Sequence, residues 1–224
     1  MSKTIFVFGA SRGIGKEIVS KFSKLDDYKV YAFSRSFKTE TQGSIHFCKL
    51  DLESETLQND LKNLISEVKT VDIVINNAGQ IVVKPFLELT QKEIQSCYQV
   101  NVSAVMQTLQ VCIPKMKKGG HIVNISSIGG FQGTLKFAGL SAYSTSKAAV
   151  VSLTELLAEE FKDSGISINC LCLGAVQTEM LETAFPGYQA PHSATEMAEF
   201  IVDFSLNSGR FMHGKVIPVS ISTP

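Results

Sequence analysis

The sequence has no excess charge of either sign, because its 224 residues contain 21 Lys plus Arg and 21 Asp plus Glu. A nucleic-acid-binding protein usually carries a basic excess, and a peripheral membrane protein carries a basic patch or a lipid signal. No apolar run approaches the roughly 18 residues of a membrane-spanning helix, and no signal-peptide pattern precedes the apolar run at 5–8. We therefore expect no nucleic-acid or membrane partner and a cytoplasmic location.

Metal-binding, disulfide and linker patterns are also absent. The five cysteines include no C-x-x-C pair, and the four histidines lie far apart in the chain. Buried free thiols in a reducing compartment are therefore expected, and no metal site. No Pro/Ser-rich linker or repeat divides the chain, and 44% of its residues are apolar. The composition predicts one folded domain over residues 1–224.

Short apolar runs alternate with segments of helical periodicity along the chain. Strands are predicted at 4–8, 29–34, 44–50, 71–76, 121–126, 167–173 and 215–219. Helices are predicted at 13–25, 52–68, 102–116 and 142–161. Apolar strands separated by helices indicate a parallel sheet covered on both faces. We expect an α/β fold, a single doubly wound Rossmann-type domain with about seven strands, in which the turn-rich segment 179–193 is either a substrate lid or a plain surface loop.

A glycine-rich turn joins the first predicted strand to the first predicted helix. Its spacing is G-x-x-x-G-x-G, which differs from the general G-x-G-x-x-G fingerprint of dinucleotide-binding proteins. Glycines permit a tight turn, and the free N–H groups at a helix start favour a pyrophosphate. The residues of this turn expected to contact a dinucleotide are Gly9, Ser11, Arg12, Gly13, Ile14 and Gly15.

The residues that follow the second predicted strand bear on the choice of dinucleotide. A carboxylate about 20 residues beyond the turn would bind the ribose hydroxyls of NAD, but the sequence has Ser34, Arg35 and Ser36 there. A guanidinium suits the 2′-phosphate of NADP, and Arg12 could reach the same group. The pair favours NADP(H) over NAD(H), although either arginine alone could be a solvated surface residue.

Polar residues also follow the third and fourth predicted strands. Asp51, with Leu52 beside it, is placed to accept a hydrogen bond from an adenine amino group. The turn that contains Asn77, Ala78 and Gly79 either faces the cofactor or only buttresses the sheet; the sequence favours neither reading.

The segment 143–147, YSTSK, is the predicted chemical centre. Tyr143 and Lys147 are four residues apart and share one face of a helix. An ammonium beside a phenol favours the phenolate and lowers its pKa from about 10. The Y-x-x-x-K pattern is common by chance, so its weight comes from Ser127, at the end of the fifth predicted strand, and from Asn101.

Taken together, these motifs resemble the short-chain dehydrogenase/reductase family, in its compact branch. The resemblance covers residues 4–219 and depends on GASRGIG at 9–15, NNAG at 76–79, NVS at 101–103, ISSIGG at 125–130 and YSTSK at 143–147. It implies a catalytic tetrad of Asn101, Ser127, Tyr143 and Lys147.

The resemblance also implies a role for each member of the tetrad. Tyr143 would exchange a proton with the substrate oxygen, and Ser127 would hydrogen-bond the carbonyl. Lys147 would bind the nicotinamide ribose and lower the pKa of Tyr143, and Asn101 would hold a water that relays protons. Gly174, Val176 and Thr178 would contact the nicotinamide side.

The sequence departs from the family pattern in three places. The segment between Ser127 and Tyr143 is a few residues longer than usual, and Leu173-Gly174 replaces Pro-Gly. The lid segment is short, and residues 219–224 lack the usual Gly-Gly, which weakens the expectation of a tetramer. A homodimer through the helices at 101–116 and 143–161 is favoured, the alternative being that all their apolar surface faces the sheet.

These observations predict an NADP(H)-dependent carbonyl reductase or alcohol dehydrogenase that acts on a small molecule. One alternative is a 3-oxoacyl-carrier-protein reductase, whose acidic partner would require basic residues near the site. The only such cluster is Lys115, Lys117 and Lys118. A second alternative is a catalytically inactive dinucleotide-binding regulator or scaffold. The substrate is not identified, and segments 130–140 and 181–193 are expected to determine it.

Overall fold

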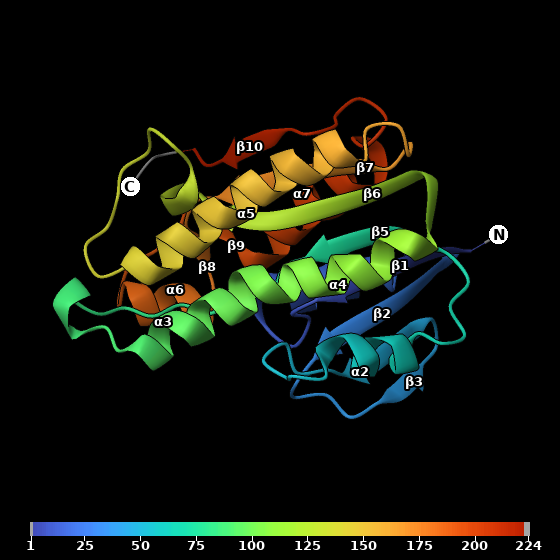
Figure 1. Cartoon of the computed structure of the whole chain (residues 1–224), viewed down its shortest axis with the longest axis horizontal. Helices are drawn as coiled ribbons and strands as arrows, with labels where there is room; N and C mark the ends of the chain where they lie inside the picture. The colour runs from blue at the N-terminus through green and yellow to red at the C-terminus, as the bar shows by residue number, and fades with distance from the viewer. Residues whose placement is uncertain (1, 222–224) are drawn as a thin grey trace.

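The computed structural model describes residues 2–221 and contains a central sheet of eight strands in the order β10-β7-β6-β5-β1-β2-β4-β3 (Figure 1). Seven strands are parallel: β1 (Lys3–Phe8), β2 (Tyr28–Ser34), β4 (Ile45–Lys49), β5 (Val71–Asn76), β6 (Met116–Ser127), β7 (Ser167–Leu173) and β10 (Val216–Val219). The eighth, β3 (Glu40–Gln42), is antiparallel to β4 at the sheet edge. The predicted doubly wound α/β fold is confirmed, with one short edge strand beyond the seven expected.

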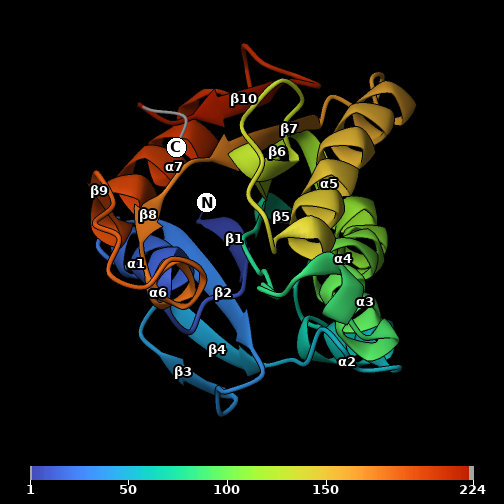
Figure 2. The same cartoon turned by 90° about the vertical axis from the view of Figure 1, so that its left-hand side faces the viewer.

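Helices cover both faces of the sheet, as Figure 2 shows. α1 (Gly13–Phe22) and α7 (Ala194–Asn207) lie on one face, and α2 (Leu57–Leu64), α4 (Ala104–Cys112) and α5 (Ser141–Glu160) lie on the other. Side chains of a strand alternate between its faces. Accordingly, Phe6 and Phe8 of β1 pack in the core under α2, α4 and α5, whereas Ile5 and Val7 pack under α1 and α7.

Four predicted elements have different boundaries in the structure. The helix predicted at 13–25 ends at Phe22. The helix predicted at 52–68 is regular only over α2. The helix predicted at 102–116 is α4, which is preceded by α3 (Gln91–Tyr98) and a π-helical segment (Gln99–Ser103). Strand β6 begins at Met116 because Met116 pairs with Val71, after which a register shift precedes the regular pairing that starts at His121. Local periodicity does not contain these long-range pairings.

The sequence reasoning also missed α7. Its start carries a capping box, in which the Ser193 side chain accepts from the Glu196 backbone N–H and the Glu196 side chain accepts from that of Ser193. Met197, Ile201 and Phe204 then follow at helical spacing and are buried against the sheet. Ser-x-x-Glu followed by apolar residues at that spacing was the signal that could have found the helix.

The carboxyl ends of the parallel strands meet at one edge of the sheet, on the left of Figure 1. Between β8 (Val176–Gln177) and β9 (His192–Ser193), which pair in a separate two-stranded sheet, lies α6 (Glu179–Ala184). The turn-rich segment 179–193, predicted to be either a substrate lid or a surface loop, thus contains a helix and a strand. Among the described residues, no helix is long and apolar enough to cross a membrane.

Candidate active site

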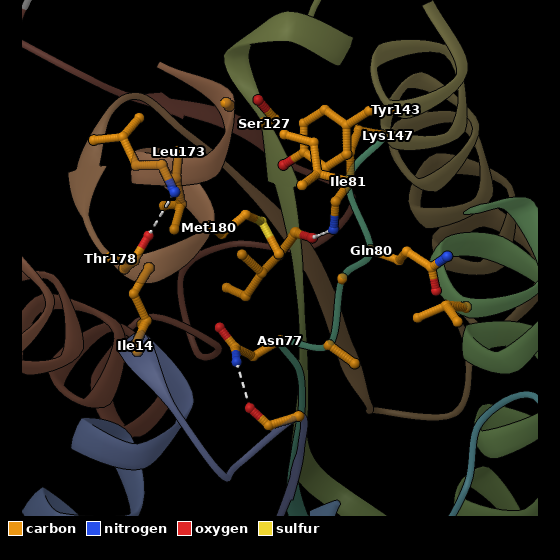
Figure 3. Close-up of a pocket in the computed structure, with 18 of the residues that line it drawn as sticks. Ile14, Asn77, Gln80, Ile81, Ser127, Tyr143, Lys147, Leu173, Thr178 and Met180 are labelled. Atoms are coloured by element: carbon orange, nitrogen blue, oxygen red, sulfur yellow. Dashed lines mark hydrogen bonds between the residues drawn. The ribbon is translucent and has the colours of Figure 1, made fainter. Parts of the chain in front are cut away.

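The glycine-rich turn brings β1, α1 and the loop after β5 into close contact. Gly9 has a φ of 82°, and a Cβ atom on it would stand 2.5 Å from the Ala78 Cα. A Cβ atom on Gly15 would stand 2.0 Å from the Gly9 carbonyl oxygen. The Asn77 Nδ2 donates to that same oxygen at 2.9 Å (Figure 3). Glycine is therefore required at both positions for the backbone segments to approach one another.

A cavity of about 980 Å³ extends along the carboxyl ends of the strands from this turn to α5 and α6. Two of the predicted site residues do not line it: Gly15, which packs behind the turn, and Asn101. The others all line it: Gly9, Ser11, Arg12, Gly13, Ile14, Ser34, Arg35, Asp51, Leu52, Asn77, Ala78, Gly79, Ser127, Tyr143, Lys147, Gly174, Val176 and Thr178. The topology thus brings together residues from most of the chain.

At one end of the cavity, Arg35 forms an ion pair with Glu53, with 3.2 Å between Nη1 and Oε2. The Arg35 side chain is 67% exposed, and Arg12 is exposed as well. Glu53 also accepts a hydrogen bond from Ser96 Oγ. Asp51 lies beside this pair, where one of its carboxylate oxygens accepts from the Glu53 backbone N–H. The sequence reasoning missed Glu53, whose proximity to Arg35 depends on the pairing of β2 with β4.

At the other end, Ser127 and Tyr143 lie next to each other in the wall of the cavity (Figure 3). Ser127 ends β6, and its hydroxyl accepts from the Gly129 backbone N–H at 3.2 Å. Tyr143 lies in the first turn of α5. Burial raises the pKa of Tyr143 to about 12, although a hydrogen bond with the Ser127 side chain acts in the opposite direction. The phenol therefore keeps its proton at neutral pH.

Lys147 lies one turn further along α5 and is 4% exposed. Its Nζ donates to the Ile125 carbonyl at 2.9 Å and lies 6.0 Å from the centre of the Tyr143 ring. Burial lowers the pKa of Lys147 to about 8. The resemblance implied a lowered pKa for Tyr143, but in the structure burial outweighs the hydrogen bond with the Ser127 side chain and the shift is upward.

Asn101 lies in the π-helical segment and is fully buried. Its Oδ1 accepts from the Gln80 backbone N–H at 2.7 Å, and its Nδ2 donates to the Gln80 carbonyl and to Ser146 Oγ. Because Ser146 belongs to α5, Asn101 fixes the loop after β5 against the helix that carries Tyr143. The predicted water-holding role of Asn101 stays a prediction.

The residues predicted to contact the nicotinamide lie on the segment that leads into α6. The Thr178 hydroxyl caps α6 by accepting from the Leu181 backbone N–H at 3.2 Å. The Gly174 backbone N–H donates to the Val219 carbonyl, and a Cβ atom on Gly174 would stand 2.4 Å from Ser220 Oγ. The glycine of Leu173-Gly174 is therefore required by close packing against the chain after β10, and residues 222–224 lie outside the described part.

The family model for short chain dehydrogenase matches residues 3–189. The chain belongs to this family.

Three curated members of the short-chain dehydrogenase family show the range of its relatives. The chain is 33% identical over 189 residues to carbonyl reductase family member 4 of Xenopus laevis, covering 80% of this chain and 78% of that protein. It is 29% identical over 193 residues to a diacetyl reductase of Staphylococcus epidermidis (80% and 74% covered). It is 26% identical over 195 residues to a 3-oxoacyl-[acyl-carrier-protein] reductase of Chlamydia trachomatis (82% and 77% covered).

Solved structures of the family superpose over nearly the whole chain. ElxO with NADP bound has a TM-score of 0.81 at 26% identity, covering 98% of this chain and 97% of that one. 4-Hydroxyisoleucine dehydrogenase complexed with NADH has a TM-score of 0.84 at 24% identity, with the same coverage, and supports the fold alone. The short-chain dehydrogenases bind a nicotinamide dinucleotide, and these two solved structures contain NADP in one case and NADH in the other. This chain is therefore an oxidoreductase of that family.

Proposed function

We propose that the chain is an NADP(H)-dependent carbonyl reductase in which Tyr143 is the proton donor. The observation that carries the proposal is the placement of Ser127, Tyr143 and Lys147 in one cavity with the glycine turn and Arg35. Bound in that cavity, NADPH would supply a hydride to the carbonyl carbon, and the carbonyl oxygen would take a proton from Tyr143 to give the secondary alcohol. The reverse reaction oxidises the alcohol.

The cavity has the features that a dinucleotide requires. The close approach at Gly9 and Gly15 leaves backbone and the start of α1 facing the space where a pyrophosphate would lie. Asp51 and Leu52 would hold the adenine, and Lys147 would hold the nicotinamide ribose. Gly174, Val176 and Thr178 would contact the nicotinamide, alongside Asn77, Ala78 and Gly79 of the loop after β5.

The preference for NADP(H) is supported by the absence of a carboxylate from residues 34–36, at the end of β2. Arg35 and Arg12 are exposed on the cavity rim, where each could bond to a 2′-phosphate. Glu53 opposes this preference, because it pairs with Arg35 and places a negative charge beside the phosphate position. When NADPH binds, Arg35 would leave its exposed ion pair with Glu53 and pair instead with the doubly charged 2′-phosphate.

The proton transfer depends on residues that the structure holds in place. The Tyr143 phenol is protonated well above neutral pH, which suits the reductive direction. Ser127 and Tyr143 would both donate hydrogen bonds to the oxygen on which negative charge develops, where such donors lower the barrier most. Asn101 would hold the water through which Tyr143 is reprotonated.

The acyl-carrier alternative has less support from the placement of charge. Lys117 and Lys118 lie near the start of β6, whereas Ser127 ends the same strand, so the basic cluster is at the opposite end of the sheet from the site. The Lys115 Nζ bonds to the Val68 carbonyl. The inactive-scaffold alternative has less support because three of the four predicted catalytic side chains, Ser127, Tyr143 and Lys147, line the cavity. A cytoplasmic location and a single domain with a lid at 179–193 stay predictions.

A thermal-shift titration with NADPH and NADH in parallel, at low salt, tests the cofactor assignment. A ligand at 100 times its dissociation constant stabilises the folded chain by about 2.7 kcal/mol. We expect that shift at lower concentrations of NADPH than of NADH. A stronger shift with NADH would overturn the cofactor assignment, and no shift with either would support the scaffold alternative.

Replacement of Tyr143 by Phe tests the catalytic assignment. The variant Tyr143→Phe should lose carbonyl-dependent NADPH oxidation by about 100-fold or more, because general acid catalysis contributes about that factor. Its NADPH-induced thermal shift should remain, since the phenol oxygen makes no part of the adenine or pyrophosphate site. Normal turnover in the variant would refute the role of Tyr143.

A further inference from the structure

We propose that the substrate is a neutral carbonyl compound with a large apolar group, preferably an aromatic ring, and that Phe137 and Phe185 determine this specificity. The inference rests on the proposed function and identifies the substrate class of the same site. It depends on the side chains that close the cavity beyond Tyr143.

Phe137 and Phe185 come from segments almost 50 residues apart and meet at the cavity. Their ring centroids are 5.2 Å apart with an interplanar angle of 71°, an edge-to-face contact. Both residues line the cavity. Phe137 belongs to the lengthened segment before α5, and Phe185 directly follows α6. An edge-to-face pair leaves part of each ring available to a third aromatic group.

Both rings are anchored through their backbones. The Phe137 carbonyl accepts from the Leu140 N–H at 3.3 Å, and the Phe185 N–H donates to the Leu181 carbonyl at 2.8 Å. Leu140 and Leu181 also line the cavity, and Leu140 is 5% exposed. Tyr188 completes this apolar wall. The wall therefore consists of aromatic and branched aliphatic side chains held by local turns, which matches a rigid apolar ligand.

No free cation faces this wall among the described residues. The cationic side chains that line the cavity are Arg12, Arg35 and Lys147. Arg12 and Arg35 lie at the adenosine end, and the Lys147 Nζ is bonded to Ile125. Lys136, in the same segment as Phe137, is bonded to the Phe131 carbonyl and to Thr134. A carboxylate or phosphate on the substrate would lose its hydration without gaining a partner.

Two pairs of substrates test the proposal with the unmodified protein and NADPH. The first pair is 1-phenyl-1,2-propanedione and 2,3-butanedione, which share an acetyl group and differ by phenyl against methyl. We expect kcat/KM to be at least about tenfold higher for the phenyl compound. The second pair is methyl 4-formylbenzoate and 4-formylbenzoate, whose charge lies across the ring from the aldehyde. We expect the anion to be the poorer substrate by roughly 100-fold.

The variants Phe137→Ala and Phe185→Ala assign the preference to the aromatic pair. Each should lower the phenyl-to-methyl ratio of kcat/KM severalfold, because the contact with the phenyl group of the substrate is reduced. A general loss of folding or of cofactor binding would instead lower both values and leave the ratio unchanged. Phe185→Leu should keep more of the ratio than Phe185→Ala. The matched control is Phe211→Ala, which removes a ring that is 73% exposed and does not line the cavity.

The outcomes separate this inference from the proposed function. A preference for 2,3-butanedione or for the anion, or an unchanged ratio in both alanine variants, would overturn the substrate class while leaving carbonyl reduction in place. If no compound is reduced, binding of 1-phenylethanol and of 2-propanol to the NADPH-saturated protein decides the matter by equilibrium dialysis. Selective binding of the phenyl alcohol supports the apolar class and refutes the proposed reaction, and equal binding refutes both.

Discussion

Tyr143 and Lys147 lie one helical turn apart on α5, and burial shifts their pKa values in opposite directions. The pKa of Tyr143 is raised to about 12, and that of Lys147 is lowered to about 8. In each case burial disfavours the charged form, which is the phenolate for tyrosine and the ammonium for lysine. The pair is therefore a protonated phenol beside an ammonium whose proton is held less tightly than usual. Tyr143 is thus in the form that can donate a proton, and its raised pKa makes it a weaker acid than a free tyrosine.

The lowered pKa of Lys147 predicts a pH dependence of stability. Below about pH 8 the lysine is protonated in both the folded and the unfolded chain, and the cost of burying the ammonium is fully present. Between about 8 and 10.5 the unfolded chain binds more protons, so stability rises with pH. Relative to Lys147→Met, the free energy of unfolding of the natural protein should rise by roughly 3 kcal/mol across that window.

Urea unfolding of both proteins from pH 7.5 to 10.5 measures this difference. Titration of the other cysteines, lysines and tyrosines is largely shared by the two proteins and therefore largely cancels in the comparison. Parallel stability curves for the two proteins would mean that the buried ammonium is better solvated than its 4% exposure indicates.

The ion pair between Arg35 and Glu53 gives a second prediction at this scale. Arg35→Ala should weaken NADPH binding by about 1–3 kcal/mol, because a charge-assisted hydrogen bond to the 2′-phosphate is lost, and should leave NADH binding nearly unchanged. Glu53→Gln should act in the opposite direction and strengthen NADPH binding by up to about fivefold, since an exposed ion pair contributes at most about 1 kcal/mol.

Isothermal titration of the three proteins with both dinucleotides checks these changes. Glu53→Gln is the informative companion, because it leaves the Arg35 side chain in place and removes only the competing carboxylate. Equal losses of NADPH and NADH affinity in Arg35→Ala would show that Arg35 supports the adenosine rather than the phosphate.

Among the elements, the turn between β1 and α1 is the one whose backbone packing is most demanding. Gly15→Ala would place a methyl group 2.0 Å from the Gly9 carbonyl oxygen and 2.5 Å from the Asn77 Nδ2. The backbone must shift to relieve the overlap, which we expect to lower the free energy of unfolding by about 1–3 kcal/mol. Dinucleotide affinity should fall as well, because the same shift moves the N–H groups at the start of α1.

Lys16→Ala is the matched control for this prediction, since Lys16 is exposed on the next position of α1. Chemical denaturation and NADPH titration of both variants give the two readouts. A stable Gly15→Ala variant with normal NADPH affinity would show that the turn is more adaptable than its contacts with Ala78 and Asn77 indicate.

Most strand boundaries followed the apolar runs of the sequence. The predicted helix at 142–161 and every predicted strand except the one at 121–126 agree with the structure to within one residue. The helix predicted at 102–116 is regular only over α4, because the π-helical segment precedes it and a 3-10 turn (Ile113–Lys115) follows it. Segment 179–193 contains a short helix that the sequence analysis did not predict, which Thr178 caps; its role as a lid stays a prediction.

In the whole molecule, α4 and α5 retain apolar surface that the sheet does not cover. Met106 of α4 is 43% exposed and Leu156 of α5 is 65% exposed. A homodimer that pairs these helices remains our prediction. Leu156→Glu should weaken dimerisation by roughly 100-fold or more, because a carboxylate would be buried without a partner. Sedimentation velocity over a range of protein concentrations measures the change.

Leu87→Glu is the control for the dimer, because Leu87 is 96% exposed and lies outside both helices. It should sediment like the natural protein. A monomeric natural protein, or a Leu156→Glu variant that remains dimeric, would exclude this interface.

The sequence by itself determined the parts of this protein that depend on neighbouring residues. The glycine turn, the four-residue spacing of Tyr143 and Lys147, and the apolar strands that form a parallel sheet all follow from local geometry. They were sufficient to predict the fold, and the cavity residues predicted from them lie together.

Only the tertiary structure decided the features that depend on residues distant in the chain. These are the direction of the Tyr143 pKa shift, the pairing of Arg35 with Glu53, and the contact of Phe137 with Phe185. The physical reason is that burial and charge act through space. The sequence specifies which groups are present, and the fold determines how much water and which partners each of them retains.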